Sequence, residues 1–261
     1  MSDYQLRFGG IARLYGEQGL ATFANTHCAV IGIGGVGSWV AEALARTGIG
    51  AITLIDLDDI CTTNTNRQIH ATKLTVGQSK VEVMAERILA INPDCQVNSI
   101  EDFVTLDNLA NLLTTKLDYV IDAIDSVKIK SAIIAHCKRQ KIKLITIGGA
   151  GGQTDPSKIA ICDLSKTYQD PLLAKVKNQL RREYNFPRDT NKKFAIEAVF
   201  SSEQLIYPDQ SGGTCHAKPK SNGAMRLDCS NGFGAVTHVT ASFAFFAVSH
   251  VIKKCLARAN N

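Results

Sequence analysis

A glycine-rich turn is the first feature of this chain that could bind a phosphate. The apolar run at residues 28–31 breaks into Gly32, Gly34, Gly35 and Gly37, and a helix-forming segment follows. Glycine permits a tight turn and a close approach of a ligand to the backbone, and the N–H groups at a helix N-terminus attract anions. The pattern predicts a nucleotide site.

A carboxylate stands where a dinucleotide fold places its ribose ligand. A second apolar run, 51–55, ends in Asp56, and Asp58 follows two positions later. An acid about 20 residues after the last glycine of such a turn hydrogen-bonds ribose hydroxyls in Rossmann folds. Strand, turn, helix and acid therefore occur in the order that a nucleotide site requires.

The residues after Asp56 favour a triphosphate over a nicotinamide. Asn64, Arg67 and Gln68 lie in a polar run, and Lys80 opens an amphipathic helical pattern. Hydride transfer needs an apolar nicotinamide pocket, whereas a guanidinium, amides and an ammonium suit a polyphosphate. For Lys80 the alternative is a solvated lysine on a helix surface.

A third apolar run, 117–121, is followed by Asp122 and Asp125. Ligands of open α/β sheets bind outside the carboxyl ends of the strands, and Mg²⁺ prefers carboxylate and water oxygens. We expect Asp125 to hold a phosphate-bound Mg²⁺. Asp122 is expected to cap the helix that begins near Val127.

The nucleotide residues together resemble the ubiquitin-activating (E1)-like adenylyltransferases, over about residues 7–152. The resemblance implies that Asp56 binds ribose, that Asn64, Arg67 and Lys80 contact the phosphates, and that Asp125 holds Mg²⁺. It also implies an arginine near the N-terminus that reaches the phosphates across a homodimer. Arg13 is the best match for that arginine, and Arg7 is a weaker one.

Further segments narrow the resemblance to the tRNA threonylcarbamoyladenosine dehydratases of that superfamily: residues 7–16, 63–70, 148–156 and 228–234. This resemblance spans nearly the whole chain. It implies ATP-dependent dehydration of the N6-threonylcarbamoyl group on adenosine 37 of tRNA, which yields a cyclic product. The threonyl carboxylate would be joined to AMP, and an internal nucleophile would then close the ring.

The charge distribution agrees with a polyanionic partner. Residues 1–124 carry 8 Lys and Arg against 14 Asp and Glu, whereas residues 125–261 carry 21 against 10. A basic segment near 172–193 suits a phosphate backbone, and its Tyr184 and Phe186 are expected to stack on unpaired anticodon-loop bases. We expect the tRNA contacts to include Lys175, Lys177, Arg181, Arg182, Lys192 and Lys193. A solvated helix face is the alternative.

Two other function classes stay open. An adenylyltransferase acting on the tail of a ubiquitin-like sulfur carrier would share every nucleotide residue. A noncatalytic or NAD-binding Rossmann module would make Arg67, Lys80 and Asp125 incidental. The basic second half and the cysteine spacing favour the tRNA enzyme over the first of these.

The eight cysteines contain no Cys-x-x-Cys pair, so no structural zinc is expected. Cys229 lies beside a glycine-rich turn and is a candidate catalytic thiol or persulfide acceptor, which would call for a sulfur-transfer partner such as a cysteine desulfurase. A structural role for Cys229 is the alternative. The first 20 residues lack a secretory signal, so a cytoplasmic location with reduced thiols is expected.

The alternation of patterns predicts an α/β fold: a Rossmann-like, doubly wound, mostly parallel sheet with a C-terminal extension of helices and loops. Residues 1–163 are expected to form the ATP-binding domain, and 164–261 to complete it with a basic helical insertion, a mobile loop near 209–223 and a last helix. Expected strands are 28–32, 51–55, 96–100, 117–121, 143–147 and 158–163; expected helices are 38–47, 79–91, 106–114 and 127–140.

The segment 235–252 is long and apolar enough to come near the minimum for a membrane span, and Lys253, Lys254 and Arg258 follow it. Its histidines, threonines and serines dilute that signal. We expect a core or dimer helix, with membrane association as the less favoured alternative.

Overall fold

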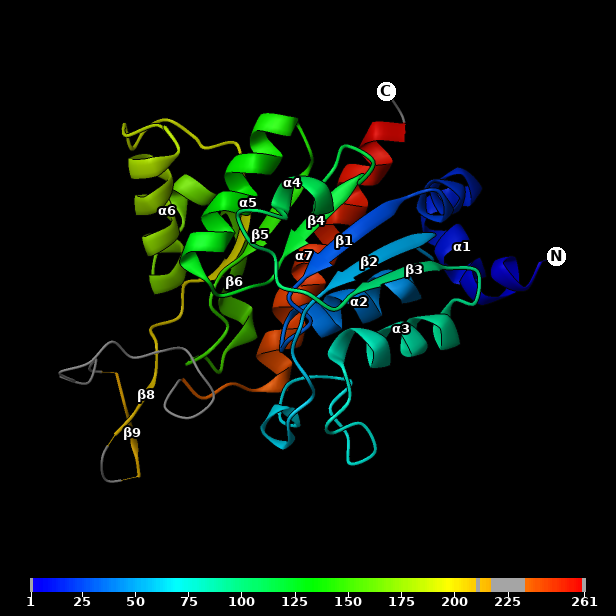
Figure 1. Cartoon of the computed structure of the whole chain (residues 1–261), viewed down its shortest axis with the longest axis horizontal. Coiled ribbons are helices and arrows are strands. Elements are labelled where there is room, and N and C mark those ends of the chain that lie inside the picture. The colour runs from blue at the N-terminus through cyan, green and yellow to red at the C-terminus, as the bar shows by residue number, and fades with distance from the viewer. Residues whose placement is uncertain (1, 210–211, 217–232, 260–261) are drawn as a thin grey trace.

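The chain forms a seven-stranded sheet in the order β3-β2-β1-β4-β5-β7-β6. The computed structural model describes residues 2–209, 212–216 and 233–259. Six strands run parallel, and β6 pairs antiparallel with β7 at one edge. The doubly wound, mostly parallel α/β sheet expected from the sequence is confirmed (Figure 1).

The strands are short apolar runs, and the central ones are buried. Their bounds are β1 His27–Ile31, β2 Ala51–Ile55, β3 Gln96–Ile100, β4 Tyr119–Asp122, β5 Leu144–Ile147, β6 Ile159–Asp163 and β7 Glu197–Ser201. The six predicted strands are present within two residues of their expected ends. β7 was not predicted, and it lies between β5 and β6 in the sheet.

Helices cover both faces of the sheet. Their bounds are α1 Asp3–Ala24, α2 Gly37–Arg46, α3 Lys80–Ile91, α4 Leu109–Leu112, α5 Val127–Gln140, α6 Pro171–Glu183 and α7 Thr237–Ala259. Alternate residues of the strands point to opposite faces. Thus Cys28 and Val30 join one apolar cluster with α2, α3 and α7, whereas Ala29 and Ile31 join another with α4, α5 and α6.

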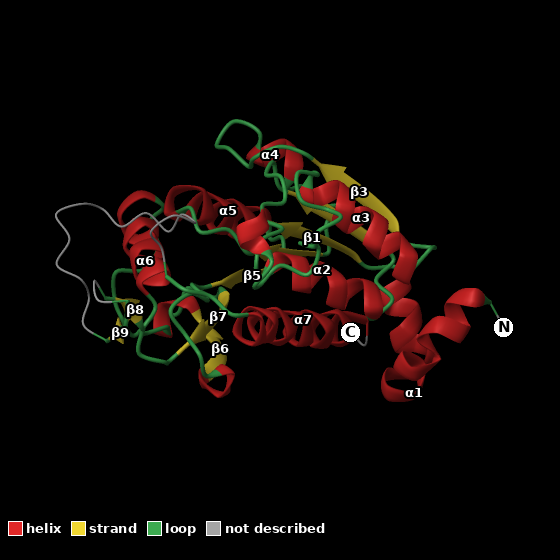
Figure 2. Ribbon diagram, turned by 90° about the horizontal axis from the view of Figure 1, so that it is seen from below, coloured by secondary structure: helices red, strands yellow, loops and turns green. Residues whose placement is uncertain are grey.

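The apolar C-terminal segment is a core helix. α7 lies along α2 (Figure 2), and Val239, Phe243, Ala247 and Val251 are fully buried in the cluster on that face. By length and composition alone the span Thr237–Arg258 would be long enough to cross a membrane, but 56% of its apolar window is buried inside the protein. This packing supports the core helix over membrane association.

A long N-terminal helix was not predicted. α1 begins with a capping box between Ser2 and Gln5 and is kinked at Gly16, whose φ is 78°. The hydroxyl of Tyr4 donates to the carbonyl of Gly48 at 2.6 Å, just before β2. α1 therefore lies at the end of the sheet from which the parallel strands start (Figure 1).

Three expectations for the loops and helices were wrong in extent. The helix expected at 106–114 is the single turn α4, and only 171–183 of the basic segment is α-helical, preceded by a 3-10 turn at Leu164–Lys166. Within the loop expected at 209–223, Thr214–Cys215 forms β9, which pairs with β8, Tyr207–Pro208. Residues 210–211 and 217–223 of that loop lie outside the described residues.

Candidate active site

The glycine-rich turn connects β1 to α2 at the carboxyl edge of the sheet, beside β4. Gly32 has a φ of 85°, which favours glycine. A Cβ on Gly37 would lie 1.7 Å from the carbonyl oxygen of Gly32, so the turn closes only without a side chain there. At Gly34 the nearest atom to an added Cβ is 3.9 Å away, which leaves its backbone approachable.

Asp56 and His70 fix the glycine-rich turn through the backbone N–H and the backbone carbonyl of Ile33. The Asp56 carboxylate accepts the N–H of Ile33 at 2.6 Å, and His70 Nε2 lies 2.9 Å from the carbonyl oxygen of Ile33. Since a carbonyl only accepts, Nε2 of His70 carries the proton. Burial lowers the pKa of His70, which keeps the ring neutral. His70 was not among the predicted site residues, although it lies in the segment 63–70 that carries the family resemblance.

Lys80 begins α3, as predicted, and its ammonium is directed to the same edge. Its Nζ lies 2.7 Å from Asp58 and 3.9 Å from Asp56, and its side chain is nearly buried. The alternative of a solvated surface lysine is therefore wrong. Lys80 is an anchored cation beside two of the expected nucleotide ligands.

Arg67 lies against the glycine turn, because a Cβ on Gly35 would be 3.3 Å from its side chain. Its guanidinium donates to the carbonyl of Thr63 at 2.9 Å. Its own carbonyl accepts the indole N–H of Trp39 at 3.0 Å. Helices α2 and α7 therefore help to fix the segment that carries Arg67.

Residues at and just before the start of α7 form further hydrogen bonds with the segment that contains Arg67. Asn66 donates to the carbonyl of Ala235 at 2.8 Å, and the hydroxyl of Thr237 donates to the carbonyl of Asn66 at 2.6 Å. Asn64 is buried in the adjacent 3-10 turn, where its side-chain oxygen accepts the N–H of Cys61. The C-terminal helix thus positions residues that come some 170 positions earlier in the chain.

Several buried polar atoms near the turn lack a partner within the described part of the chain. They are Ser38 Oγ, Gln68 Oε1 and His70 Nδ1. Unpartnered buried polar atoms are costly and rare, so each calls for an explanation such as a ligand. Ser38 lies in the first turn of α2, whose N-terminus follows the glycine turn where an anion is expected.

The expectation that Asp122 caps a helix was wrong. Asp122 ends β4, is fully buried, and pairs with Lys130 at 3.0 Å and with the hydroxyl of Thr146 at 2.8 Å. Burial raises its pKa, and Lys130 opposes that rise. The N-cap of α5 is Ser126 instead. Because the Asp122 carboxylate is buried at the end of β4, its charge requires a buried cation, which Lys130 supplies.

Lys130, like His70, supports this edge of the sheet and was not among the predicted site residues. Besides Asp122, its ammonium donates to the carbonyl of Ile124 at 2.8 Å, and it therefore fixes the loop that presents Asp125. A lysine within the apolar face of α5 was the available signal. Asp125 itself is exposed, and among the described residues its carboxylate has no hydrogen-bond or ion-pair partner.

No group of three metal-ligating side chains occurs in the described residues. Mg²⁺ does not need one, since it usually keeps several waters and binds through one or two carboxylates and the phosphates of its nucleotide. The exposed carboxylate of Asp125 fits that mode. Cys229 lies outside the described residues.

Arg13 is exposed on α1, at the opposite end of the sheet from the glycine turn (Figure 1). It therefore cannot reach a nucleotide bound at the glycine turn of its own chain. A contribution from Arg13 therefore requires a second copy of the chain, and the exposed apolar residues Leu6, Leu14 and Tyr15 on the same helix would suit such a contact.

Four of the six cations expected to contact tRNA lie at the surface of the basic segment. Lys175, Arg182, Lys192 and Lys193 are exposed. Lys177 is half-buried and donates to the carbonyl of Thr167, and Arg181 lies over the ring of Phe194. The stacking role expected for Phe186 was wrong, because Phe186 is buried edge-on against Phe194.

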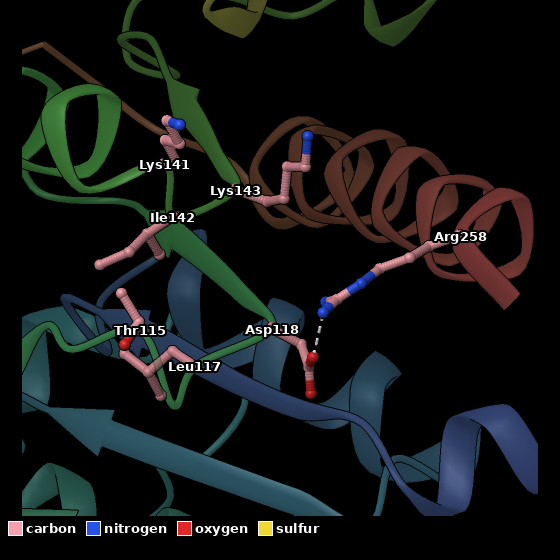
Figure 3. Close-up of a pocket in the computed structure, with 7 residues that line it drawn as sticks. All are labelled: Thr115, Leu117, Asp118, Lys141, Ile142, Lys143 and Arg258. Carbon is pink, nitrogen blue, oxygen red and sulfur yellow. Dashed lines mark hydrogen bonds and ion pairs between the residues drawn. The ribbon is translucent and has the colours of Figure 1, made fainter. Parts of the chain in front are cut away.

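A hollow of about 230 Å³ also exists at the amino end of the sheet. Figure 3 shows Arg258 reaching from α7 to Asp118, with Lys143 beside them. The Arg258–Asp118 distance is 2.8 Å, and Asp118 also accepts the N–H of His27. This hollow contains none of the predicted nucleotide residues, so it is not the candidate active site.

The chain matches known proteins along nearly its whole length. The ThiF family model matches residues 9–261. A tRNA threonylcarbamoyladenosine dehydratase of Escherichia coli strain K12 is 57% identical over 256 residues, which is 98% of this chain and 96% of that protein. Two crystal structures of the E. coli dehydratase TcdA, one in complex with ATP and one with AMP, are each 54% identical and superpose with a TM-score of 0.88, covering 99% of this chain and 98% of theirs. With its glycine turn, its acids after β2 and β4 and a family match from residue 9 to its end, the chain belongs to the ThiF family.

Proposed function

We propose that this protein is an ATP-dependent tRNA threonylcarbamoyladenosine dehydratase, which cyclises the N6-threonylcarbamoyl group of adenosine 37. The observation that carries the proposal is the set of side chains at one sheet edge: Arg67, Lys80 and Asp125 around a glycine turn. The 57% identity to the E. coli dehydratase over nearly both chains supports this substrate over a ubiquitin-like carrier.

The chemistry begins with a carboxylate, which is a poor acyl donor. An oxygen of the threonyl carboxylate attacks the α-phosphorus of ATP, the bond to the β-phosphate oxygen breaks, and pyrophosphate leaves. A nucleophile of the threonylcarbamoyl group then attacks the acyl carbon, loses its proton, and expels AMP. The substrate supplies both partners of the ring closure, so no nucleophile of the enzyme is required.

The residues of the site stabilise the charge that moves during this transfer. The N-terminus of α2 and the guanidinium of Arg67 suit the phosphates, and Lys80 is close enough to exchange Asp58 for a phosphate oxygen. Asp56 suits the ribose. Mg²⁺, when bound to the nucleotide, would neutralise part of the phosphate charge, and Asp125 would hold it.

The proposal extends to the assembly and the location. A homodimer would bring Arg13 of one copy to the site of the other. A tRNA substrate would place the protein in the cytoplasm, and the exposed cations Lys175, Arg182, Lys192 and Lys193 would contact its backbone. A sulfur-transfer partner and a role for Cys229 stay predictions.

Pyrophosphate release tests the proposed substrate directly. The purified protein would be given ATP and Mg²⁺ with one of three acyl donors: tRNA that carries threonylcarbamoyladenosine, the same tRNA without the modification, or a carrier protein with a Gly-Gly tail. We expect release only with the modified tRNA. Release with the carrier alone would assign the second activity, and no release with any donor would refute adenylation.

A further inference from the structure

A second hollow, of about 380 Å³, lies between the start of α6 and β8. That volume falls within the usual range for small-ligand sites, about 300–1,000 Å³. The hollow is lined by residues with aromatic, amide and charged side chains together with a few apolar ones. Its aromatic, amide and charged lining includes Tyr168, Gln169, Asp170, Lys177, Gln204 and Tyr207.

The floor of this pocket is tied to the carboxyl edge of the sheet. Asp170 is 5% exposed, and its carboxylate accepts the N–H of Gly149 at 3.0 Å and that of Leu173 at 2.9 Å. Gly149 follows β5, and β4 separates β5 from β1. Two strand spacings amount to about 10 Å, so the floor of the pocket lies on the same edge of the sheet as the glycine turn, about that distance along it.

The pocket offers one exposed aromatic ring that is already held in place. Tyr168 is 58% exposed, and its ring meets Phe200 at 5.2 Å between centroids and an angle of 67°. Tyr207 forms a buried part of the wall, against Phe233. Phe233 in turn lies on the loop at Gly151 and Gly152, where an added Cβ would be 2.9 and 2.7 Å from it.

The chemistry of this lining suits an unpaired nucleobase. A base has a flat face that stacks on an aromatic ring and edges that bond to amide side chains such as Gln169 and Gln204. The ammonium of Lys177, which donates to the carbonyl of Thr167 at 2.6 Å, adds a positive charge at the rim. A Gly-Gly peptide tail has no flat ring to stack, so the pocket does not suit a carrier protein.

We infer that this pocket binds an unstacked nucleobase of the RNA substrate, with its face on Tyr168. The inference rests on the proposed function, since it assumes that the substrate is the anticodon loop of a tRNA. It replaces Phe186 with Tyr168 as the stacking residue. Binding the base here would hold the loop while the threonylcarbamoyl group lies at the glycine turn.

The test combines protein variants with abasic RNA. Affinities for modified anticodon stem-loops would be measured by fluorescence anisotropy with the wild-type protein, Tyr168→Ala, Tyr168→Phe and the control Phe103→Ala, an exposed aromatic outside the pocket. Stacking one base is worth about 1–3 kcal/mol, so Tyr168→Ala should weaken binding about fivefold to a hundredfold. Tyr168→Phe and Phe103→Ala should bind within about twofold of wild type.

Stem-loops that keep the modified base 37 and carry a single abasic nucleotide at position 36 or 38 identify the base. Removing the base that stacks on Tyr168 should weaken RNA binding by the wild-type protein. The same abasic nucleotide should weaken binding by Tyr168→Ala only slightly, because that variant has already lost the stacking contact. Unchanged affinity of Tyr168→Ala, or additive losses at both positions, would overturn the inference.

Two further measurements separate this inference from the proposed function. ATP affinity should be the same in Tyr168→Ala as in wild type, because Tyr168 lies outside the glycine turn, and the variant should stay folded, because more than half of the side chain is exposed. If the wild-type protein releases pyrophosphate with modified tRNA while Tyr168→Ala binds RNA normally, only the pocket assignment fails. If the wild-type protein releases none, the proposed function itself fails.

Discussion

Strand β4 has an aspartate at each end, and the two aspartates differ in how far they and their cationic partners are buried. Asp118 precedes β4 and pairs with Arg258 in the partly exposed hollow at the amino end. Asp122 ends β4 and pairs with Lys130, where both side chains are 0% exposed. The amino-end pair closes a surface hollow. The buried pair instead supports the loop that carries Asp125. An aspartate therefore has a structural role at the amino end of β4, whereas the aspartate at the carboxyl end helps to position the candidate active site.

The largest effect is expected from breaking the buried pair. Lys130→Met leaves Asp122 as an uncompensated buried acid, which should lower the free energy of unfolding by about 3–5 kcal/mol. The matched control is Arg258→Ala, which breaks a partly exposed pair and should cost less than about 1 kcal/mol. Chemical denaturation of both variants measures the difference. Equal losses would show that burial does not distinguish the two ends.

Next in size is the loss of catalysis at the carboxyl edge. Removing one group that stabilises transition-state charge costs about a hundredfold to a thousandfold in rate, which we expect for Arg67→Ala and Asp125→Ala in tRNA-dependent pyrophosphate release. Lys143→Ala, at the amino-end hollow, is the control and should turn over normally. Normal turnover in Asp125→Ala would remove that residue from the site.

Glycines at the two ends sharpen the comparison further. Gly34→Ala meets nothing closer than 3.9 Å in the protein, so it should fold normally yet weaken ATP binding at least about tenfold, because the methyl group occupies the phosphate approach. Gly50→Ala would place its Cβ 1.8 Å from the carbonyl oxygen of Ala24, so it should lose stability instead. Calorimetric titration with ATP and thermal melts separate the two. Unchanged ATP affinity in Gly34→Ala would show that the phosphates do not bind against the backbone of Gly34.

The smallest effect concerns pH. Burial lowers the pKa of His70 below the ordinary value of 6.5, so the folded state binds its proton less readily than the unfolded state does. His70 therefore contributes stability above about pH 6.5 that is lost as the pH falls below it. His70→Gln should lose less stability than wild type between pH 7.5 and pH 5. His27→Gln is the comparison at the amino end, where the pKa is also lowered but the ring is less buried. Identical pH profiles for wild type and His70→Gln would contradict a neutral, buried His70.

The sequence predicted the parts of this site that follow from local pattern. The glycine turn, Asp56, Lys80 at the start of α3 and the strands that carry them follow from hydrophobic runs ending in turn residues and acids. It did not predict β7, because whether Glu197–Ser201 joins the sheet depends on β5 and β6 far away in the chain.

The remaining misses were also matters of tertiary structure. Asp122 and Ser126 are both suitable caps by residue type, and only the burial of the strand end and Lys130 decide between them. Phe186 and Tyr168 are both aromatics near basic residues, and one is buried by Phe194 while the other is exposed at a pocket. No local pattern contains that information.

The fate of one oxygen atom tests the central claim most directly. A tRNA whose threonyl carboxylate is labelled with oxygen-18 would be converted by the enzyme with ATP, and the released nucleotide would be analysed by mass spectrometry. If the carboxylate attacks the α-phosphorus, AMP must carry one labelled oxygen when the ring closes. Label found in inorganic phosphate, or in water alone with unlabelled AMP, would contradict adenylation at this site.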